Sequence, residues 1–149
     1  MEEIIETSRL RTPLHLWIVG ILSLLWNAFG AMDYTMTMTR NAAYLKSASA
    51  AQMAYFGSFP AWAIALWALG VWGALAGSVL LLARSRLAVI AFVVSLAGLA
   101  GSTLYQFAVH PVPADMRGPA MLVLNLIIWA AAIGLLLYAR SMRQRGVLR

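Results

Sequence analysis

The side chains that can do chemistry in this sequence are amides, hydroxyls and a carboxylate set within long apolar runs. Asn27 and Asp33 stand six residues apart near the end of the first run, and Asn125 stands six residues after Pro119 in the last run. At a rise of 1.5 Å per helical residue, this spacing places each amide about 9 Å below the outer membrane surface. Because an unpaired polar group is costly in lipid, each of these side chains needs a partner or a ligand.

The depths estimated in this way predict that polar and aromatic groups lie in one layer of the outer leaflet. Amides beside tryptophans are typical of a small-ligand pocket, and they are equally typical of hydrogen bonds that hold helices together. We expect interhelical hydrogen bonding to explain the layer, and we keep a pocket open to the outside as the alternative. The predicted layer consists of Trp26, Asn27, Gly30, Asp33, Tyr34, Trp67, Ser102, Thr103, Gln106 and Asn125.

Asp33 has two interpretations of its own. It can be an interfacial carboxylate paired with Arg40 or Arg117, or it can form a cation or proton site with Asn27. No acidic or basic residue lies between the ends of any apolar run. This argues against the small multidrug exporters, which depend on a glutamate in the middle of the membrane.

Other classes of chemistry lack the residues that they need. Cysteine is absent, which excludes disulfides, thiolate metal sites and cysteine-based quinone reductases. The two histidines, His15 and His110, fall at opposite ends of the predicted bundle, about 30 Å apart, and cannot share a haem. No carboxylate pair, nucleophile–base pair or metal-binding set can be assembled. We therefore expect no enzyme activity, no metal and no cofactor.

The elements that carry these residues are predicted to be membrane-spanning helices. The chain has 149 residues, of which 62% are hydrophobic and 11% are charged, against about 25% charged in a soluble domain. We expect an all-α membrane protein whose single domain, residues 1–149, is a four-helix bundle with a short interfacial helix in the loop 35–59. The first run also resembles a signal peptide, but three leading glutamates argue against that. The predicted spans are about 13–34, 60–83, 87–109 and 119–139.

Small residues are spaced for close helix packing in the second and third runs. Gly73 and Gly77 stand four residues apart, and so do Ala97 and Gly101, while Gly70 extends the first series. Small residues at this spacing allow two membrane helices to approach closely. With only a short turn between the two runs, we expect an antiparallel hairpin.

Basic residues predict the orientation in the membrane. Eight Lys and Arg lie in the amino terminus, the turn 84–86 and the tail, against three in the loops 35–59 and 110–118. The positive-inside rule then places both termini in the cytoplasm. Because the basic residues stand at the ends of apolar runs and form no separate patch, we expect the lipid bilayer as partner and no nucleic acid.

The run Trp26-Asn27-x-x-Gly30-x-x-Asp33-Tyr34 resembles the signature of a family of small four-helix bacterial inner-membrane proteins. That family is sometimes loosely labelled a sugar transporter. Similar stretches occur at Pro60-Ala61-Trp62, Trp67–Gly73 and Tyr138-Ala139-Arg140. The resemblance implies a multi-pass protein of the bacterial inner membrane, and it implies no mechanism.

Three functions fit these observations. The first is a non-enzymatic accessory or interaction subunit of a homo-oligomer or a larger membrane complex. The second is a small oligomeric transporter or channel, with a path near Asn27, Asp33 and Asn125. The third is a binder of an apolar ligand such as a lipid, quinone or carotenoid in the layer that contains the tryptophans. We expect the first.

Overall fold

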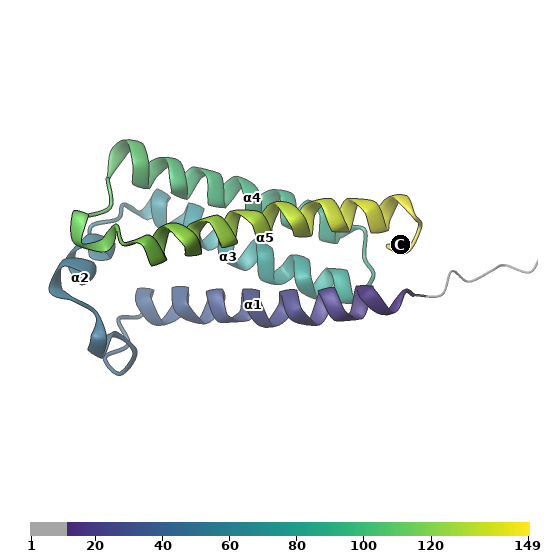
Figure 1. Ribbon diagram of the computed structural model, residues 1–149, viewed down its shortest axis with the longest axis horizontal. Coiled ribbons are helices and arrows are strands. Elements are labelled where there is room, and N and C mark those ends of the chain that lie inside the picture. The colour runs from purple at the N-terminus through teal and green to yellow at the C-terminus, as the bar shows by residue number, and fades with distance from the viewer. Residues whose placement is uncertain (1–11) are drawn as a thin grey trace, which may run out of the picture.

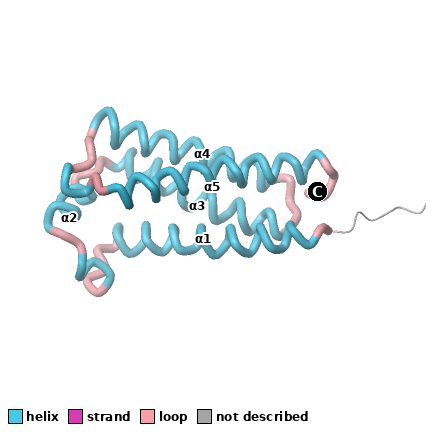
Figure 2. Tube along the Cα trace, in the orientation of Figure 1, coloured by secondary structure: helices cyan, strands magenta, loops and turns pink. Residues whose placement is uncertain are grey.

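Long helices make up most of the chain in the computed structural model, which describes residues 12–149 (Figure 1). Within that range four helices are long and apolar enough to cross a membrane, and loops and short turns join them without any strand (Figure 2). The predicted all-α, four-helix membrane fold is confirmed. The long helices are α1 Leu14–Met38, α3 Ala61–Leu82, α4 Leu87–Leu104, which continues as the π-helical turn η2 Tyr105–Val109, and α5 Pro119–Gln144.

Two of these helices run further than predicted. α1 continues to Met38 instead of ending near residue 34, and α5 continues to Gln144 instead of residue 139. In the last turn of α1, the hydroxyl of Thr35 donates to the carbonyl of Ala31, and Thr39 donates in the same way to Thr35, both at 2.7 Å. These bonds satisfy the threonine side chains on the helix itself, so the alternating Thr-Met stretch stays helical.

The loop 35–59 contains two short helical pieces where one helix was predicted. They are the 3₁₀ turn η1, Tyr44–Ser47, and the helix α2, Ala50–Gly57. Ser49 starts α2 with a capping box, since its hydroxyl accepts from the backbone N–H of Gln52 while the Gln52 side chain accepts from the backbone N–H of Ser49. This reciprocal pair satisfies two free donors at the start of the helix and separates α2 from η1.

The two ends of the bundle are built differently. The end that holds Thr12, the turn 83–86 and Arg149 is called the terminal end, and the end that holds the loops 39–60 and 110–118 is called the link end. At the terminal end, Gly146 turns the chain back with a φ of 70°. Arg149 then donates to the Arg84 carbonyl at 2.7 Å and accepts from Arg86 at 3.0 Å. The carboxyl terminus and the start of α1 therefore lie at the same end of the bundle (Figure 1).

Each end has its own core. The terminal core gathers α1, α3, α4, α5 and the folded-back carboxyl terminus, and the link core gathers α2, the start of α3, η2 and the loop after it. The buried residues of the terminal core include Leu16, Leu81, Phe92, Ala139, Met142 and Leu148. Those of the link core are Tyr55, Phe59, Ala63, Tyr105 and Met116.

The long helices pack in the order α1, α3, α4, α5, and the hairpin of α3 and α4 has the largest contact. A Cβ on Gly98 would stand 2.4 Å from the backbone nitrogen of Gly70, and one on Gly73 would stand 3.0 Å from the backbone nitrogen of Ser95. Gly77 faces the ring of Phe92 and Gly101 faces Leu66 in the same interface. The glycines thus let the two backbones touch.

Ala97 does not take part in this interface. It is exposed, whereas Gly98, which was not predicted, is buried against α3. The prediction for Ala97 was wrong because spacing alone does not say which of two adjacent small residues faces the partner helix.

Candidate functional site

Asn27 lies near the middle of α1 and bonds to α3. Its Nδ2 donates to the Ser78 hydroxyl at 2.9 Å and to the Ala74 carbonyl at 3.3 Å, and Ser78 itself donates to Ala74 at 3.1 Å. Asn27 is nearly buried, with 9% of its surface exposed. Because α1 extends to Met38, Asn27 stands about 16 Å from the link end of its helix, deeper than predicted. This amide joins two helices within the bundle.

Asn125 lies on the surface of α5, away from Asn27. Every residue from Pro119 to Ile127 is exposed, and the buried residues of α5 are Ala139 and Met142 near the terminal end. The prediction that the two amides lie side by side in one layer was therefore wrong. Its cause is the packing order, since α5 rests on α4 and meets the rest of the bundle through the terminal core.

The other hydroxyls and amides of the predicted layer are also separated. Ser102 is buried, and its hydroxyl has no partner among residues 12–149, while Thr103 and Gln106 are partly buried. The polar bond between α3 and α4 comes instead from Ser95, whose hydroxyl donates to the Gly70 carbonyl at 2.6 Å. Sequence analysis missed Ser95 because an isolated serine in an apolar run gives no sign of which helix it faces.

The aromatic members of the layer occupy two places. Trp26 is 40% exposed and borders the space between α1 and α5. Trp67 lies toward the link end, where Tyr34 meets it edge-on at 5.0 Å and Phe56 stacks on it at 5.5 Å. Gly30 lies between Trp26 and Tyr34 in the sequence, and a side chain at this position would enter open space. The aromatic members of the predicted layer thus divide between the space beside α5 and an aromatic cluster at the link end.

The aromatic cluster at the link end surrounds His110, and sequence analysis did not predict it. The Tyr55 ring stacks parallel to the His110 ring, with centroids 4.8 Å apart, and its hydroxyl donates to the His110 carbonyl at 3.0 Å. The Ser58 hydroxyl lies 2.9 Å from His110 Nε2, and Phe59 and Tyr105 pack around the ring. Burial raises the pKa of Tyr55 above its usual value. These contacts fix α2 onto the end of α4.

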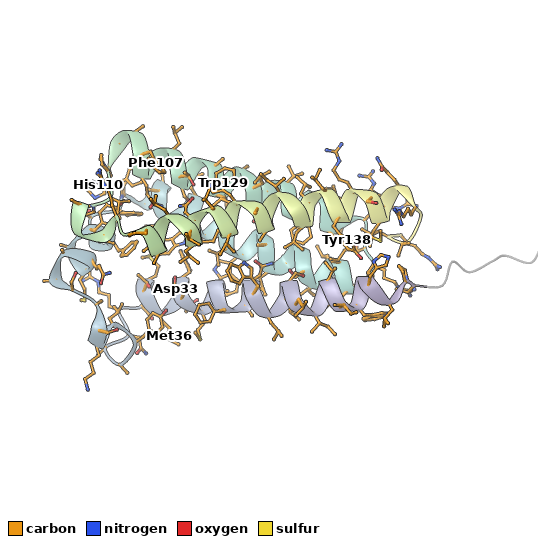
Figure 3. The ribbon with its side chains drawn as sticks, in the orientation of Figure 1. Asp33, Met36, Phe107, His110, Trp129 and Tyr138 are labelled. Atoms are coloured by element: carbon orange, nitrogen blue, oxygen red, sulfur yellow. The ribbon has the colours of Figure 1, made fainter. Side chains whose placement is uncertain are left out.

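Among the residues that the structure describes, Asp33 bonds to Tyr44 in the loop after α1 and not to an arginine. The hydroxyl of Tyr44 donates to Asp33 Oδ1 at 2.5 Å, whereas Arg117 donates to the Val112 carbonyl at 2.6 Å. The pKa of Tyr44 is raised chiefly because its proton is held in this hydrogen bond. The predicted pairing of Asp33 with Arg40 or Arg117 was wrong. Figure 3 shows Asp33 on the link half of α1, with His110 at the same end of the molecule.

Two spaces result from this arrangement. The first, the link cavity, measures about 930 Å³ and lies between the end of α1, η1 and α2, with Asp33, Arg40, Tyr44 and Phe56 in its walls. The second, the α1–α5 seam, measures about 570 Å³ and is almost entirely apolar. Trp26 and Gly134 border the seam, and toward the terminal end His15 Nδ1 lies 2.6 Å from the Tyr138 hydroxyl.

The residues named for a transport path lie in three separate places. Asp33 lines the link cavity, Asn27 lies between α1 and α3, and Asn125 lies on the exposed side of α5. Among the residues that the structure describes, no group of three His, Cys, Asp or Glu side chains is placed to hold a metal ion.

No family model, curated protein or solved structure matches this chain. The resemblance to small four-helix bacterial inner-membrane proteins therefore stays a prediction.

Replacing Asn27 with leucine is expected to loosen α1 from α3. The loss of the bonds to Ser78 and Ala74 should lower the free energy of unfolding by about 0.6 to 1.7 kcal/mol, the usual range for a hydrogen bond between membrane helices. Equilibrium unfolding in bicelles measures this change in the free energy of unfolding. Ser23→Ala is the matched control, because within residues 12–149 the Ser23 hydroxyl bonds to the Gly20 carbonyl of its own helix and to no other helix. An Asn27→Leu protein as stable as the wild type would contradict this role.

Proposed function

We propose that this chain is a non-enzymatic subunit of a membrane assembly and that it binds its partner through the link half of α5. The observation that carries the proposal is the exposed amide of Asn125. It stands about 9 Å inside α5 from Pro119, on a stretch with no buried residue. In hydrocarbon that amide lacks the water that would satisfy it, so a hydrogen bond from another molecule stabilises it.

The contrast with Asn27 supports this argument. Both residues are amides in membrane-spanning helices, and Asn27 is held by two bonds to α3. Asn125 takes part in none of the side-chain hydrogen bonds among residues 12–149, and the residues from Met121 to Ile127 around it are exposed. One amide thus serves packing within the chain, and the other is free to serve contact between chains.

A second copy of this chain is the partner that the residue pattern favours. Leu122, Asn125 and Trp129 follow one another at spacings of three and four residues, on the part of α5 that lies before the terminal core. This is the pattern of a helix face that packs along a second helix, with one polar residue setting the register. In a two-fold dimer with both copies in the same orientation, the two Asn125 amides meet at one depth. An amide both donates and accepts, so the pair satisfies itself.

The proposed setting is the bacterial inner membrane, with both termini in the cytoplasm. The support is the count of basic residues, since the terminal end carries Arg84, Arg86 and the arginines of the tail. Under the positive-inside rule the link end, with its loops 39–60 and 110–118, then faces outward.

Replacing Asn125 with leucine is expected to weaken self-association by about tenfold, because one hydrogen bond between membrane helices in a favourable setting contributes about 1 to 2 kcal/mol. The measurement is single-molecule photobleaching in vesicles over a series of protein-to-lipid ratios. Asn125→Gln, which keeps the amide, is the control and should retain association. A wild-type protein that stays monomeric at every ratio, or equal association of both variants, overturns the proposed dimer.

The α1–α5 seam favours a second candidate function, which is the binding of an apolar ligand. Its volume of about 570 Å³ lies in the range of small-molecule sites, and Leu22, Trp26 and Ile127 line it. Native mass spectrometry after gentle extraction from the membrane tests whether the seam binds an apolar ligand. A recurrent apolar small molecule that is lost on Gly134→Phe, which fills the seam, supports ligand binding. Bulk lipid alone argues against it.

A further inference from the structure

The link cavity carries charges of both signs in its walls. Asp33 and Arg40 line it, and its other lining residues are neutral at pH 7. Among the described residues, these two side chains form no ion pair with each other. The cavity as a whole is therefore electrically balanced, which favours a ligand with both charges over a simple anion or cation.

The backbone holds the two charged groups on different walls. Asp33 belongs to α1, and Tyr44 occupies its Oδ1 with a hydrogen bond, which leaves Oδ2 as an acceptor. Arg40 follows the end of α1 in the left-handed conformation, with a φ of 51°. Its guanidinium reaches toward α2, where Nη2 lies 3.6 Å from the position of a Cβ on Gly57. The guanidinium of Arg40 thus lies near α2, whereas the carboxylate of Asp33 lies on α1.

An aromatic wall completes the cavity. Phe56 lines it, and Trp67 stacks behind Phe56 with ring centroids 5.5 Å apart. Stacked rings of this kind hold each other in place and offer a face to a cation or to methylene groups. With a volume of about 930 Å³ and an open side, the cavity admits a small organic molecule.

We infer that the link cavity binds a small zwitterion, with its ammonium group at Asp33 and its phosphate or carboxylate group at Arg40. Guanidinium binds such oxyanions with two parallel hydrogen bonds, and a carboxylate accepts from a primary ammonium. The cavity lies at the link end of α1, which is an end of a membrane-spanning helix, so two sources share this chemistry. One is the phosphoethanolamine headgroup of a lipid, and the other is a free α-amino acid. The inference does not depend on the proposed dimer.

The test uses the full chain in nanodiscs of phosphatidylcholine, whose quaternary ammonium cannot donate a hydrogen bond. In one arm, phosphatidylethanolamine is added at a low mole fraction, and the lipid retained on the protein is counted by native mass spectrometry. In the other arm, glycine and soluble phosphoethanolamine are titrated, and the fluorescence of the tryptophans is followed. Binding in the first arm alone identifies the lipid headgroup as the source, and binding in the second arm with glycine identifies a free amino acid.

Asp33→Asn and Arg40→Gln are each expected to weaken retention or binding by about tenfold, because each removes one charge-assisted contact. Lys46→Gln is the matched control, since Lys46 is an exposed charge on η1 that does not line the cavity. Circular dichroism checks that each variant keeps its helices. Three results would overturn the inference. They are no binding of any probe by the wild type, binding by Asp33→Asn and Arg40→Gln as tight as that of the wild type, or a loss in Lys46→Gln as large as theirs.

Discussion

Replacing Gly98 with alanine is expected to force α3 and α4 apart. The new Cβ would stand 2.4 Å from the backbone nitrogen of Gly70 and 2.7 Å from the carbonyl oxygen of Leu66. Both atoms belong to the backbone of α3, so no side chain can move aside to make room. Overpacking of this kind costs about 1 to 3 kcal/mol, and a clash with backbone belongs at the upper end of that range. We therefore expect the free energy of unfolding to fall by about 3 kcal/mol.

Gly30→Ala and Gly134→Ala are the matched controls. Apart from the adjacent backbone of its own helix, no described atom lies within 4 Å of a Cβ built at either position, although both glycines stand in membrane-spanning helices. Alanine favours a helix over glycine, so these two variants should be as stable as the wild type or slightly more stable. Reversible unfolding in mixed micelles, followed by circular dichroism, measures the free energy of unfolding of all three variants. If Gly98→Ala were as stable as its controls, the close approach of α3 and α4 would be contradicted.

Replacing Phe59 with alanine is expected to release α2 from the bundle. Phe59 is 8% exposed in the link core, where it meets Tyr55 and Tyr105 edge-on and lies against His110. Removing a buried phenylalanine costs about 3 to 5 kcal/mol in a well-packed core. The terminal core does not contain Phe59 and should keep the long helices together. The loss should therefore appear as local opening at the link end.

Hydrogen–deuterium exchange resolves this local effect. Amides of residues 50–59 should exchange faster in Phe59→Ala, while those of the helices near the terminal core stay protected. Phe107→Ala is the control, because Phe107 lies near the same end of the molecule (Figure 3) but is 71% exposed. Uniformly faster exchange along the whole chain would show that the link core is not a separate unit.

The sequence predicted what periodicity and length determine. Four apolar runs bounded by prolines and basic residues gave the four spans, and glycine spacing placed Gly70, Gly73 and Gly77 in α3, where the structure packs them against α4. The ends of α1 and α5 were placed too early, because polar residues near a membrane surface can satisfy their hydrogen bonds within the helix, as Thr35 does.

The candidate site could not be predicted to the same degree. Depth along a helix is readable from sequence, but the direction in which a side chain faces depends on which helices touch. Asn27 and Asn125 were placed together by depth, and the packing order α1, α3, α4, α5 separated them. The cluster around His110 was missed because its members come from α2, the residues that follow α2, and η2, which are far apart in the sequence. The burial of Leu148 was missed because a basic tail gives no sign that it folds back.

Cysteine cross-linking tests the proposed contact surface on α5 most directly. The chain contains no cysteine, so single-cysteine variants report one position each. Leu122→Cys lies on the face of Asn125, whereas Ile127→Cys lies on the same helix but borders the α1–α5 seam. In native membranes treated with a mild oxidant, we expect a cross-linked dimer for Leu122→Cys, little for Ile127→Cys, and loss of the dimer when Asn125→Leu is added to Leu122→Cys. Equal cross-linking at both positions, or monomer alone at both, would contradict the account.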